Sequence, residues 1–315
     1  MTSKLFFTSL ILVLTSVFCL AQDAKNMEGT WNLIITENGK EVPSWLEIKH
    51  SGISTYTGRF CYKFGSARPV AEIKINEGKF SFAIPPQWEP KGFDMQLMGE
   101  LEGEKLKGTM IYTDGKSYPW VATRSPKLAY TENPKWGKAK ELFNGKDLSG
   151  WTAIAGGNQE QVENQWLVEN GVMKSPKSGA NLITNEKFGD FKLHIEFKYP
   201  KDSNSGIYLR GRYEVQVADN MGLAPSNVLF GGIYGLLTPN EMVAKPAGEW
   251  QVYDITLIGR RVTIVANGKT IINDQNIPGM TGGALDNNEA DLGPLLIQGD
   301  HGPVALRNIV ITPVE

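Results

Sequence analysis

Short strand patterns separated by turn signals run along nearly the whole chain, and no stretch shows the periodicity of an α-helix of four turns. Glu77-Gly78 and Asn267-Gly268 are turn dipeptides that lie between runs in which apolar residues alternate with polar ones. Such alternation buries one face of a strand, and a tight turn joins two strands as a hairpin. The 34 Gly, 17 Pro, 8 Trp, 10 Tyr and 13 Phe fit this pattern. The sequence therefore predicts an all-β protein.

The first residues have the pattern of a secretory signal peptide. Lys4 supplies a positive charge, residues 5–20 are largely apolar, and Cys19-Leu20-Ala21 places small residues at the −3 and −1 positions. We predict a signal peptide at residues 1–21, cleavage before Gln22 and export to the periplasm or the extracellular space. A lipoprotein, cleaved before Cys19, ranks second because Phe18 is large for that site. No later stretch is long and apolar enough for a membrane span.

Eight strand patterns crowd into residues 27–125 and are joined mostly by hairpins, which predicts a small up-and-down barrel of unknown role. The opening Gly29-Thr30-Trp31 and the late Arg124 resemble the lipocalin-like pairing of a Trp with a covering Arg. Residues 126–140 contain Pro126 and Pro134 but no periodicity, and we interpret them as a linker.

Strand patterns resume in residues 141–315. Apolar residues from Phe191 to Phe197 alternate with polar ones, and this half of the chain predicts an antiparallel sandwich of two sheets. The whole chain carries a formal charge of −2, with 34 acidic and 32 basic residues. That balance excludes the clustered basic surface that nucleic-acid binders use.

One segment of the second half concentrates polar side chains. We interpret residues 204–217 as a single strand whose odd positions are apolar and face the core. The even positions then form one polar face, made of Tyr208, Arg210, Arg212, Glu214 and Gln216. This face has no Lys, and its rigid planar donors suit fixed hydrogen bonds to hydroxyl or carbonyl groups. A solvated outer face with Arg–Glu pairing is the alternative.

A second polar cluster, Gln298-Gly299-Asp300-His301-Gly302, lies near the end of the chain. The chain has only 3 His, and His301 stands next to a carboxylate at a predicted strand end. An imidazole in that position is suited to proton transfer, with a turn histidine that caps its own backbone as the alternative.

Six motifs follow one another along the second half of the chain. In chain order they are Leu142-Phe143-Asn144-Gly145-Lys146-Asp147-Leu148-Ser149-Gly150-Trp151, Asn204 through Gln216, Gly231-Gly232-Ile233-Tyr234-Gly235, Ala247-Gly248-Glu249-Trp250, Asn267-Gly268, and Gln298…His301-Gly302…Arg307-Asn308-Ile309. In this order they make the second half similar to the 3-keto-disaccharide hydrolase domain family. The resemblance covers residues 141–312 and leaves the first 140 residues uncovered. Gln251 and Leu306 depart from the usual family residues, Asn and Phe.

The resemblance implies a concanavalin-like jelly-roll sandwich that acts on glycosides oxidised to a ketone at C-3. Such domains are described as 3-keto-glucoside 1,2-lyases and 3-keto-2-hydroxyglucal hydratases, and the two steps together give net hydrolysis. A ketone at C-3 acidifies the C-2 proton, so that a base can remove it and the C-1 substituent leaves by β-elimination. This chemistry needs a base, donors for the enolate oxygen and an acid for the leaving oxygen.

Within this scheme we assign Glu214 as the base and His301 as the acid or the alternative base. Arg210 and Arg212 are candidate donors to the C-3 oxygen or to ring hydroxyls. Gln216 is a candidate positioning group, Tyr208 a wall of the site, and Glu249 and Asp300 reserve residues. A divalent metal held by some of Glu214, Gln216 and His301 would act on the ketone as a Lewis acid, but no ligand spacing in the sequence demonstrates it.

Two other classes of function stay open. A noncatalytic, lectin-like carbohydrate-binding module would share the sandwich architecture, because fold does not fix function. A carrier of apolar ligands would place the main role in the first domain. An enzyme turns over the oxidised sugar, whereas a lectin binds intact sugars and turns none over.

Overall fold

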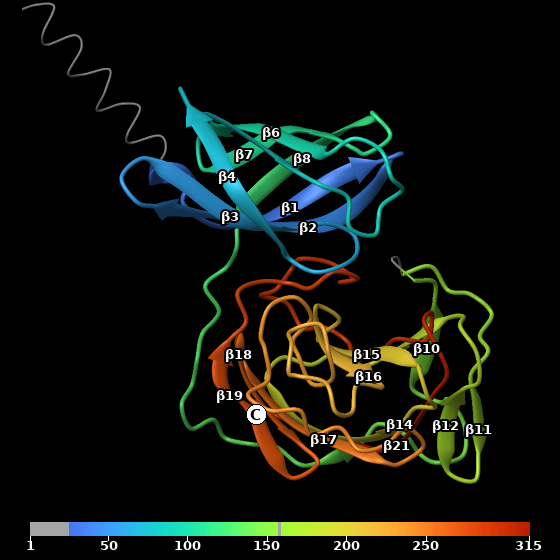
Figure 1. The fold of residues 1–315 in the computed structure, drawn as a ribbon. Helices are drawn as coiled ribbons and strands as arrows, with labels where there is room; N and C mark the ends of the chain where they lie inside the picture. The colour runs from blue at the N-terminus through green and yellow to red at the C-terminus, as the bar shows by residue number, and fades with distance from the viewer. Residues whose placement is uncertain (1–24, 157–158) are drawn as a thin grey trace, which may run out of the picture. The chain divides into compact units, whose positions relative to one another are not determined.

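The computed structural model describes residues 25–156 and 159–315, which form two compact units (Figure 1). The first unit holds the described chain up to Tyr62 together with Arg68–Ser125, and the second holds Lys63–Ala67 and Pro126–Glu315. The predicted signal peptide, residues 1–21, lies outside the described residues. No helix within the described ranges has the length and apolar composition needed to cross a membrane.

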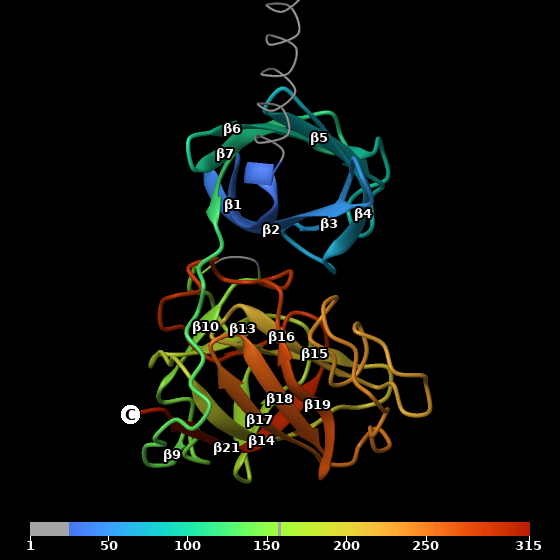
Figure 2. The same cartoon turned by 90° about the vertical axis from the view of Figure 1, so that its left-hand side faces the viewer.

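The first unit is a closed antiparallel barrel in which each strand pairs with the next and the last strand pairs with the first. Figure 2 shows the ring of strands. The strands are β1 (Gly29–Glu37), β2 (Lys40–Ser51), β3 (Thr55–Cys61), β4 (Arg68–Asn76), β5 (Lys79–Ile84), β6 (Met95–Glu102), β7 (Lys105–Ile111) and β8 (Ser117–Arg124). This confirms the predicted up-and-down barrel.

Side chains fill the inside of the barrel. The buried cluster includes Trp31, Phe60, Phe82 and Trp120. The guanidinium of Arg124 lies 3.8 Å from the centroid of the Trp31 ring, as the lipocalin-like pattern predicts. Arg124 also donates to the backbone carbonyls of Asn26 and Glu28, which ties the end of β8 to the segment before β1.

The second unit is a sandwich of two antiparallel sheets, which confirms the predicted jelly roll. One sheet has the order β10 (Trp151–Ile154), β13 (Asn181–Thr184), β20 (Leu296–Ile297), β15 (Asn204–Leu209), β16 (Tyr213–Ala218). The other has the order β11 (Leu167–Glu169), β12 (Val172–Ser175), β21 (Val304–Pro313), β14 (Phe191–Lys198), β17 (Gln251–Ile258), β18 (Arg261–Ala266), β19 (Lys269–Asn276), and the short β9 (Lys140–Glu141) pairs with β21. Some strands that pair in these sheets, such as β15 with β20 and β14 with β21, are far apart in sequence and are joined by crossover connections.

The predicted linker, residues 126–140, lies against the second unit. Trp136 forms an isolated bridge with Val314, and the ammonium group of Lys192 lies 4.5 Å from the centroid of its ring. The guanidinium of Arg261 lies 5.0 Å from the centroid of the Tyr130 ring. These contacts hold the segment on the sandwich.

Candidate functional site

Residues 204–217 form a hairpin. β15 and β16 pair from Asn204↔Ala218 to Leu209↔Tyr213, and the chain turns at Arg210 and Gly211, whose φ angles are +53° and +67°. The amide of Gly211 donates to the carbonyl of Tyr208 across this turn. The prediction of one continuous strand is therefore wrong, because two successive left-handed residues reverse the chain. The even positions of the two strands still share one face, which carries Tyr208, Glu214 and Gln216, but Arg210 and Arg212 lie in the turn and are not part of it.

The two arginines of this segment hold loops in place. The Arg212 Nε donates to Asp286 Oδ1 at 2.7 Å, and its Nη1 donates to the carbonyl of Asp291 at 2.9 Å. The Arg210 Nη2 donates to the carbonyl of Gly259 at 2.6 Å. Both side chains are buried. These contacts use donors that the sequence interpretation assigned to the substrate, and they give the arginines a structural role.

Glu214 and Tyr208 do lie together. They are direct cross-strand partners, so their side chains project from the same face of the sheet. The Tyr208 hydroxyl donates to the carbonyl of Gly282 at 3.1 Å. The neighbouring pair on this face is Gly206 with Gln216. A Cβ atom at Gly206 would lie 2.4 Å from Glu214 Oε1, so the missing side chain makes room for the carboxyl group.

Two loops complete the surroundings of Glu214. Gly231 and Tyr234 donate backbone hydrogen bonds to the carbonyls of Gln216 and Glu214, which extends the sheet beyond β16. On another side, Thr281 Oγ1 accepts a hydrogen bond from the Glu214 amide. The sequence interpretation missed Tyr234 and Thr281, although the glycines around Tyr234 in the matched motif were a signal that a backbone approaches closely there.

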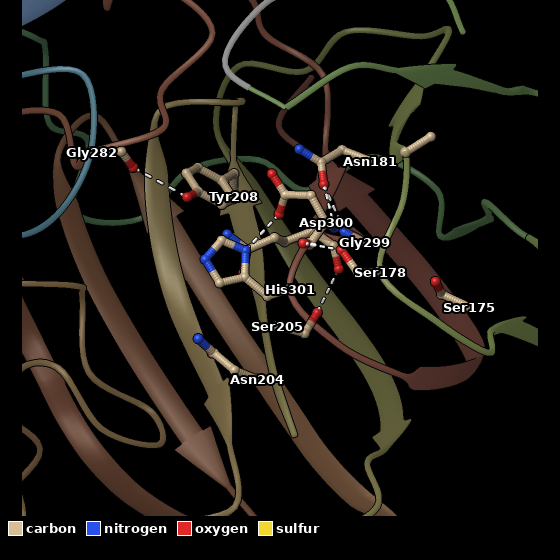
Figure 3. A network of polar contacts seen from close by, with 12 residues as sticks. Ser175, Ser178, Asn181, Asn204, Ser205, Tyr208, Gly282, Gly299, Asp300 and His301 are labelled. Carbon is tan, nitrogen blue, oxygen red and sulfur yellow. Dashed lines mark hydrogen bonds and ion pairs between the residues drawn. The ribbon is translucent and has the colours of Figure 1, made fainter. Parts of the chain in front are cut away.

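Asp300 and His301 form a hydrogen-bonded pair at the end of β20 (Figure 3). The His301 Nδ1 lies 2.6 Å from Asp300 Oδ1, and the imidazole is half exposed. The buried Asn181 on β13 positions this turn, because its Oδ1 accepts hydrogen bonds from the amides of Gly299 and Asp300. Ser178 donates to the Asp300 carbonyl. The carboxylate thus orients the ring and leaves the other ring nitrogen for a reactant.

Electrostatics couple this pair to Glu214. Burial raises the pKa of Glu214 to about 8, although the Tyr208 hydroxyl and the charge of His301 oppose the shift. The hydrogen bond with Asp300 raises the pKa of His301 above its usual 6.5, and the charge of Glu214 adds to this. A carboxyl group with a raised pKa is a stronger base once ionised, and an imidazole with a raised pKa keeps its proton to a higher pH than a free imidazole.

Gln216 on β16 and Gln298 directly after β20 carry buried side-chain oxygens that have no hydrogen-bond partner among the described residues. Gln216 Nε2 donates to Asn204 Oδ1 at 3.0 Å, but Gln216 Oε1 accepts no hydrogen bond. The Oε1 of Gln298 is also buried and has no partner. The sequence interpretation quoted Gln298 in a motif but assigned it no role.

Glu249 does not join this group. It is exposed in the loop before β17, and its amide donates to the carbonyl of Pro246. The proposed metal ligands Glu214, Gln216 and His301 include only one carboxylate and one imidazole. No cluster of three or more His, Cys, Asp or Glu side chains suited to a metal ion occurs in the described parts of the chain. The residues present therefore do not form a typical divalent metal site.

Comparison with known proteins gives a consistent family. A family model described as a 3-keto-alpha-glucoside-1,2-lyase-like domain matches residues 138–312, which is more than half of the chain. A 3-keto-disaccharide hydrolase from Bacteroides thetaiotaomicron is 26% identical over 171 residues, with coverage of 43% of this chain and 54% of that protein. The chain thus spans about half the length of that curated relative.

Solved structures from Parabacteroides distasonis ATCC 8503 are also similar to this chain. One candidate glycosyl hydrolase has 30% sequence identity and a TM-score of 0.47, with 59% of this chain and 93% of the other covered. Another has 24% identity and a TM-score of 0.43, with 56% and 98% covered. From the family match and its six ordered motifs it follows that the chain belongs to the 3-keto-alpha-glucoside-1,2-lyase-like domain family.

Proposed function

We propose that this protein is an exported enzyme that cleaves 3-keto-glycosides by removing the C-2 proton and expelling the C-1 substituent. Family membership supports a carbohydrate-active hydrolase. The observation that carries the finer assignment is the buried Glu214 carboxyl group, which interacts electrostatically with the Asp300–His301 pair. Elimination needs one strong base and one acid, and these groups have the matching proton affinities.

In the proposed mechanism Glu214 is the base and His301 the acid. Glu214 takes the C-2 proton, which the C-3 ketone acidifies, and an enolate forms. The C–O bond at C-1 then breaks while His301 protonates the leaving oxygen, and Asp300 stabilises the imidazolium before this transfer. Addition of water to the resulting double bond completes net hydrolysis. Tyr208, the cross-strand partner of Glu214, is held by its hydrogen bond to the Gly282 carbonyl and forms a wall beside the carboxyl group.

The arrangement favours elimination over direct displacement at C-1. Ordinary glycosidases need two carboxyl groups placed on either side of the glycosidic bond, one as acid and one as base or nucleophile. Here Asp300 is hydrogen-bonded to His301, so Glu214 is the carboxyl group left for the substrate. One carboxyl group and an imidazole are sufficient when the substrate carries a ketone next to C-2.

A comparison of two sugars tests the proposal. The protein should consume the 3-keto form of a glucoside and release its C-1 substituent, while the unoxidised form of the same glucoside stays intact. Glu214→Gln should abolish this turnover and retain binding of the 3-keto sugar. Binding of both sugars without turnover of either would assign the protein to the lectin-like class instead.

A further inference from the structure

Gln216 and Gln298 lie on either side of the Glu214 carboxyl group. Gly206 on β15 pairs with Gln216 on β16, and on its other side the carbonyl of Gly206 accepts a hydrogen bond of 2.8 Å from the Gln298 amide. Neighbouring strands lie roughly 4.8 Å apart, which places the two glutamine backbones about 10 Å from each other across Gly206. The carboxyl group of Glu214 occupies the space above Gly206.

Gln216 is held through its side chain and Gln298 through its backbone, and the side-chain oxygen of each has no hydrogen-bond partner among the described residues. The side chain of Gln216 is fixed by Asn204, and the backbone of Gln298 is fixed by Gly206 and by Ser205, whose hydroxyl donates to the Gln298 carbonyl at 2.7 Å. The residues are only 4% and 8% exposed. A buried carbonyl oxygen without a donor destabilises the free protein, so a ligand that brings a donor to each of these oxygens gains binding energy.

The chemistry of these oxygens specifies what they bind. A carboxamide oxygen only accepts hydrogen bonds, so the ligand must bring donors. Anions do not meet this requirement, and Glu214 repels them when it is ionised. The described residues do not gather the acidic and imidazole side chains of a typical metal site. Sugar hydroxyl groups do meet the requirement.

We propose that Gln216 and Gln298 accept hydrogen bonds from the 4-hydroxyl and 6-hydroxyl groups of the oxidised sugar and so select substrates by their hydroxyl pattern. This inference rests on the proposed function and deepens it. With one acceptor on each side of Glu214, the ring is held with its C-2 hydrogen above the carboxyl group. A sugar that lacks either hydroxyl group leaves one oxygen buried and unpaired, and the site discriminates against it.

Gln298→Met is the most informative variant. Methionine keeps the length of the side chain, removes the acceptor and ends the burial of an unpaired carbonyl. We expect the free protein to unfold at the same or a higher temperature, while kcat/KM for the 3-keto-glucoside falls about tenfold, the effect of one lost hydrogen bond. Gln216→Met tests the second acceptor in the same way. Gln275→Met, on the exposed part of β19, serves as the matched control, and its activity should be unchanged.

Deoxy sugars separate recognition from a general structural role. The 4-deoxy and 6-deoxy forms of the same 3-keto-glucoside should each be tested with the wild type and with both variants. We expect one deoxy sugar to be a poor substrate for the wild type and to lose nothing further in Gln298→Met, because the hydrogen bond is already missing. Gln216→Met should likewise lose no further activity on the deoxy sugar that lacks the hydroxyl group bound by Gln216.

The outcomes distinguish the two proposals. A wild type that turns over no 3-keto-glycoside overturns the proposed function, and this inference falls with it. An active wild type whose glutamine variants keep full activity overturns only the inference. Equal losses on the parent and both deoxy sugars would also overturn it, because they would show a structural role.

Discussion

At the scale of single residues, burial converts Glu214 from an ordinary acid into a base suited to neutral pH. Its pKa of about 8 means that roughly a tenth of the groups are ionised at pH 7, and that fraction rises with pH. His301 must keep its proton, so the active form pairs an ionised Glu214 with a protonated His301. Activity should therefore rise as Glu214 ionises and fall as His301 loses its proton.

Glu214→Gln should separate activity from stability. Between pH 4.5 and about 8 the folded protein holds a proton on Glu214 that the unfolded chain releases, so the free energy of unfolding decreases as pH rises through this interval. Glutamine removes that decrease. Between pH 4.5 and pH 8.5 the free energy of unfolding of the variant should therefore rise by a few kcal/mol relative to that of the wild type, since one pKa unit corresponds to about 1.4 kcal/mol.

Denaturant unfolding at several pH values measures this gain, and the same preparation should lose activity ~100-fold or more, as for other general bases. A stability difference that does not change with pH would show that Glu214 is not held in its neutral form by burial.

Asp300→Asn tests the coupling within the pair. Asparagine keeps the shape of the side chain but removes the charge that raises the pKa of His301. The imidazole should then lose its proton at lower pH, so the alkaline limb of the pH–rate profile should move to lower pH. Activity at pH 8 should fall more than activity at pH 6. An alkaline limb at the wild-type position would assign it to another group.

At the scale of elements, local turn chemistry decided what the sequence could predict. Asn267-Gly268 joins β18 to β19 with φ angles of +50° and +82°, as its residue types favour. The β15–β16 turn needs the same left-handed pair but begins with Arg210, a residue that seldom adopts it. Gly211, an isolated glycine in an apolar alternation, was the available signal.

The polar partners of that hairpin come from distant parts of the chain, and no local pattern shows them. Arg212 binds the loop at Asp286 and Asp291. Its planar donors predicted fixed hydrogen bonds, but the sequence did not show which groups would accept them. Tyr208 and Glu214 were predicted to lie on one face for the wrong reason, because they are cross-strand partners rather than neighbours on one strand.

Arg212→Ala should therefore act on stability before it acts on substrate binding. It removes an ion pair that is buried on the Arg212 side and partly exposed at Asp286, together with the donor to Asp291, so we expect a loss of about 2 kcal/mol in the free energy of unfolding. At a temperature where the variant remains folded, KM should rise less than the stability falls. Calorimetry combined with steady-state kinetics measures both. A fully stable variant with a strongly raised KM would restore Arg212 as a substrate donor.

At the scale of the whole molecule, the alternation of strands and turns predicted both architectures, the barrel and the sandwich. Each strand of the barrel pairs with the next strand in the sequence, so the barrel could be predicted from the hairpin signals alone. The sheets of the sandwich pair distant strands such as β15 and β20, so only the family resemblance supplied that topology. Export remains a proposal, and a mature protein that begins at Gln22 in N-terminal sequencing would support it.

The fate of the C-2 hydrogen tests the central claim most directly. A 3-keto-glucoside labelled with deuterium at C-2 should lose its label to the solvent during turnover by the wild-type protein, because Glu214 exchanges the proton that it removes. Glu214→Gln should show neither label loss nor release of the C-1 substituent. Mass spectrometry of the released sugar reads the label. Products that keep all of the deuterium would exclude elimination and require direct displacement at C-1.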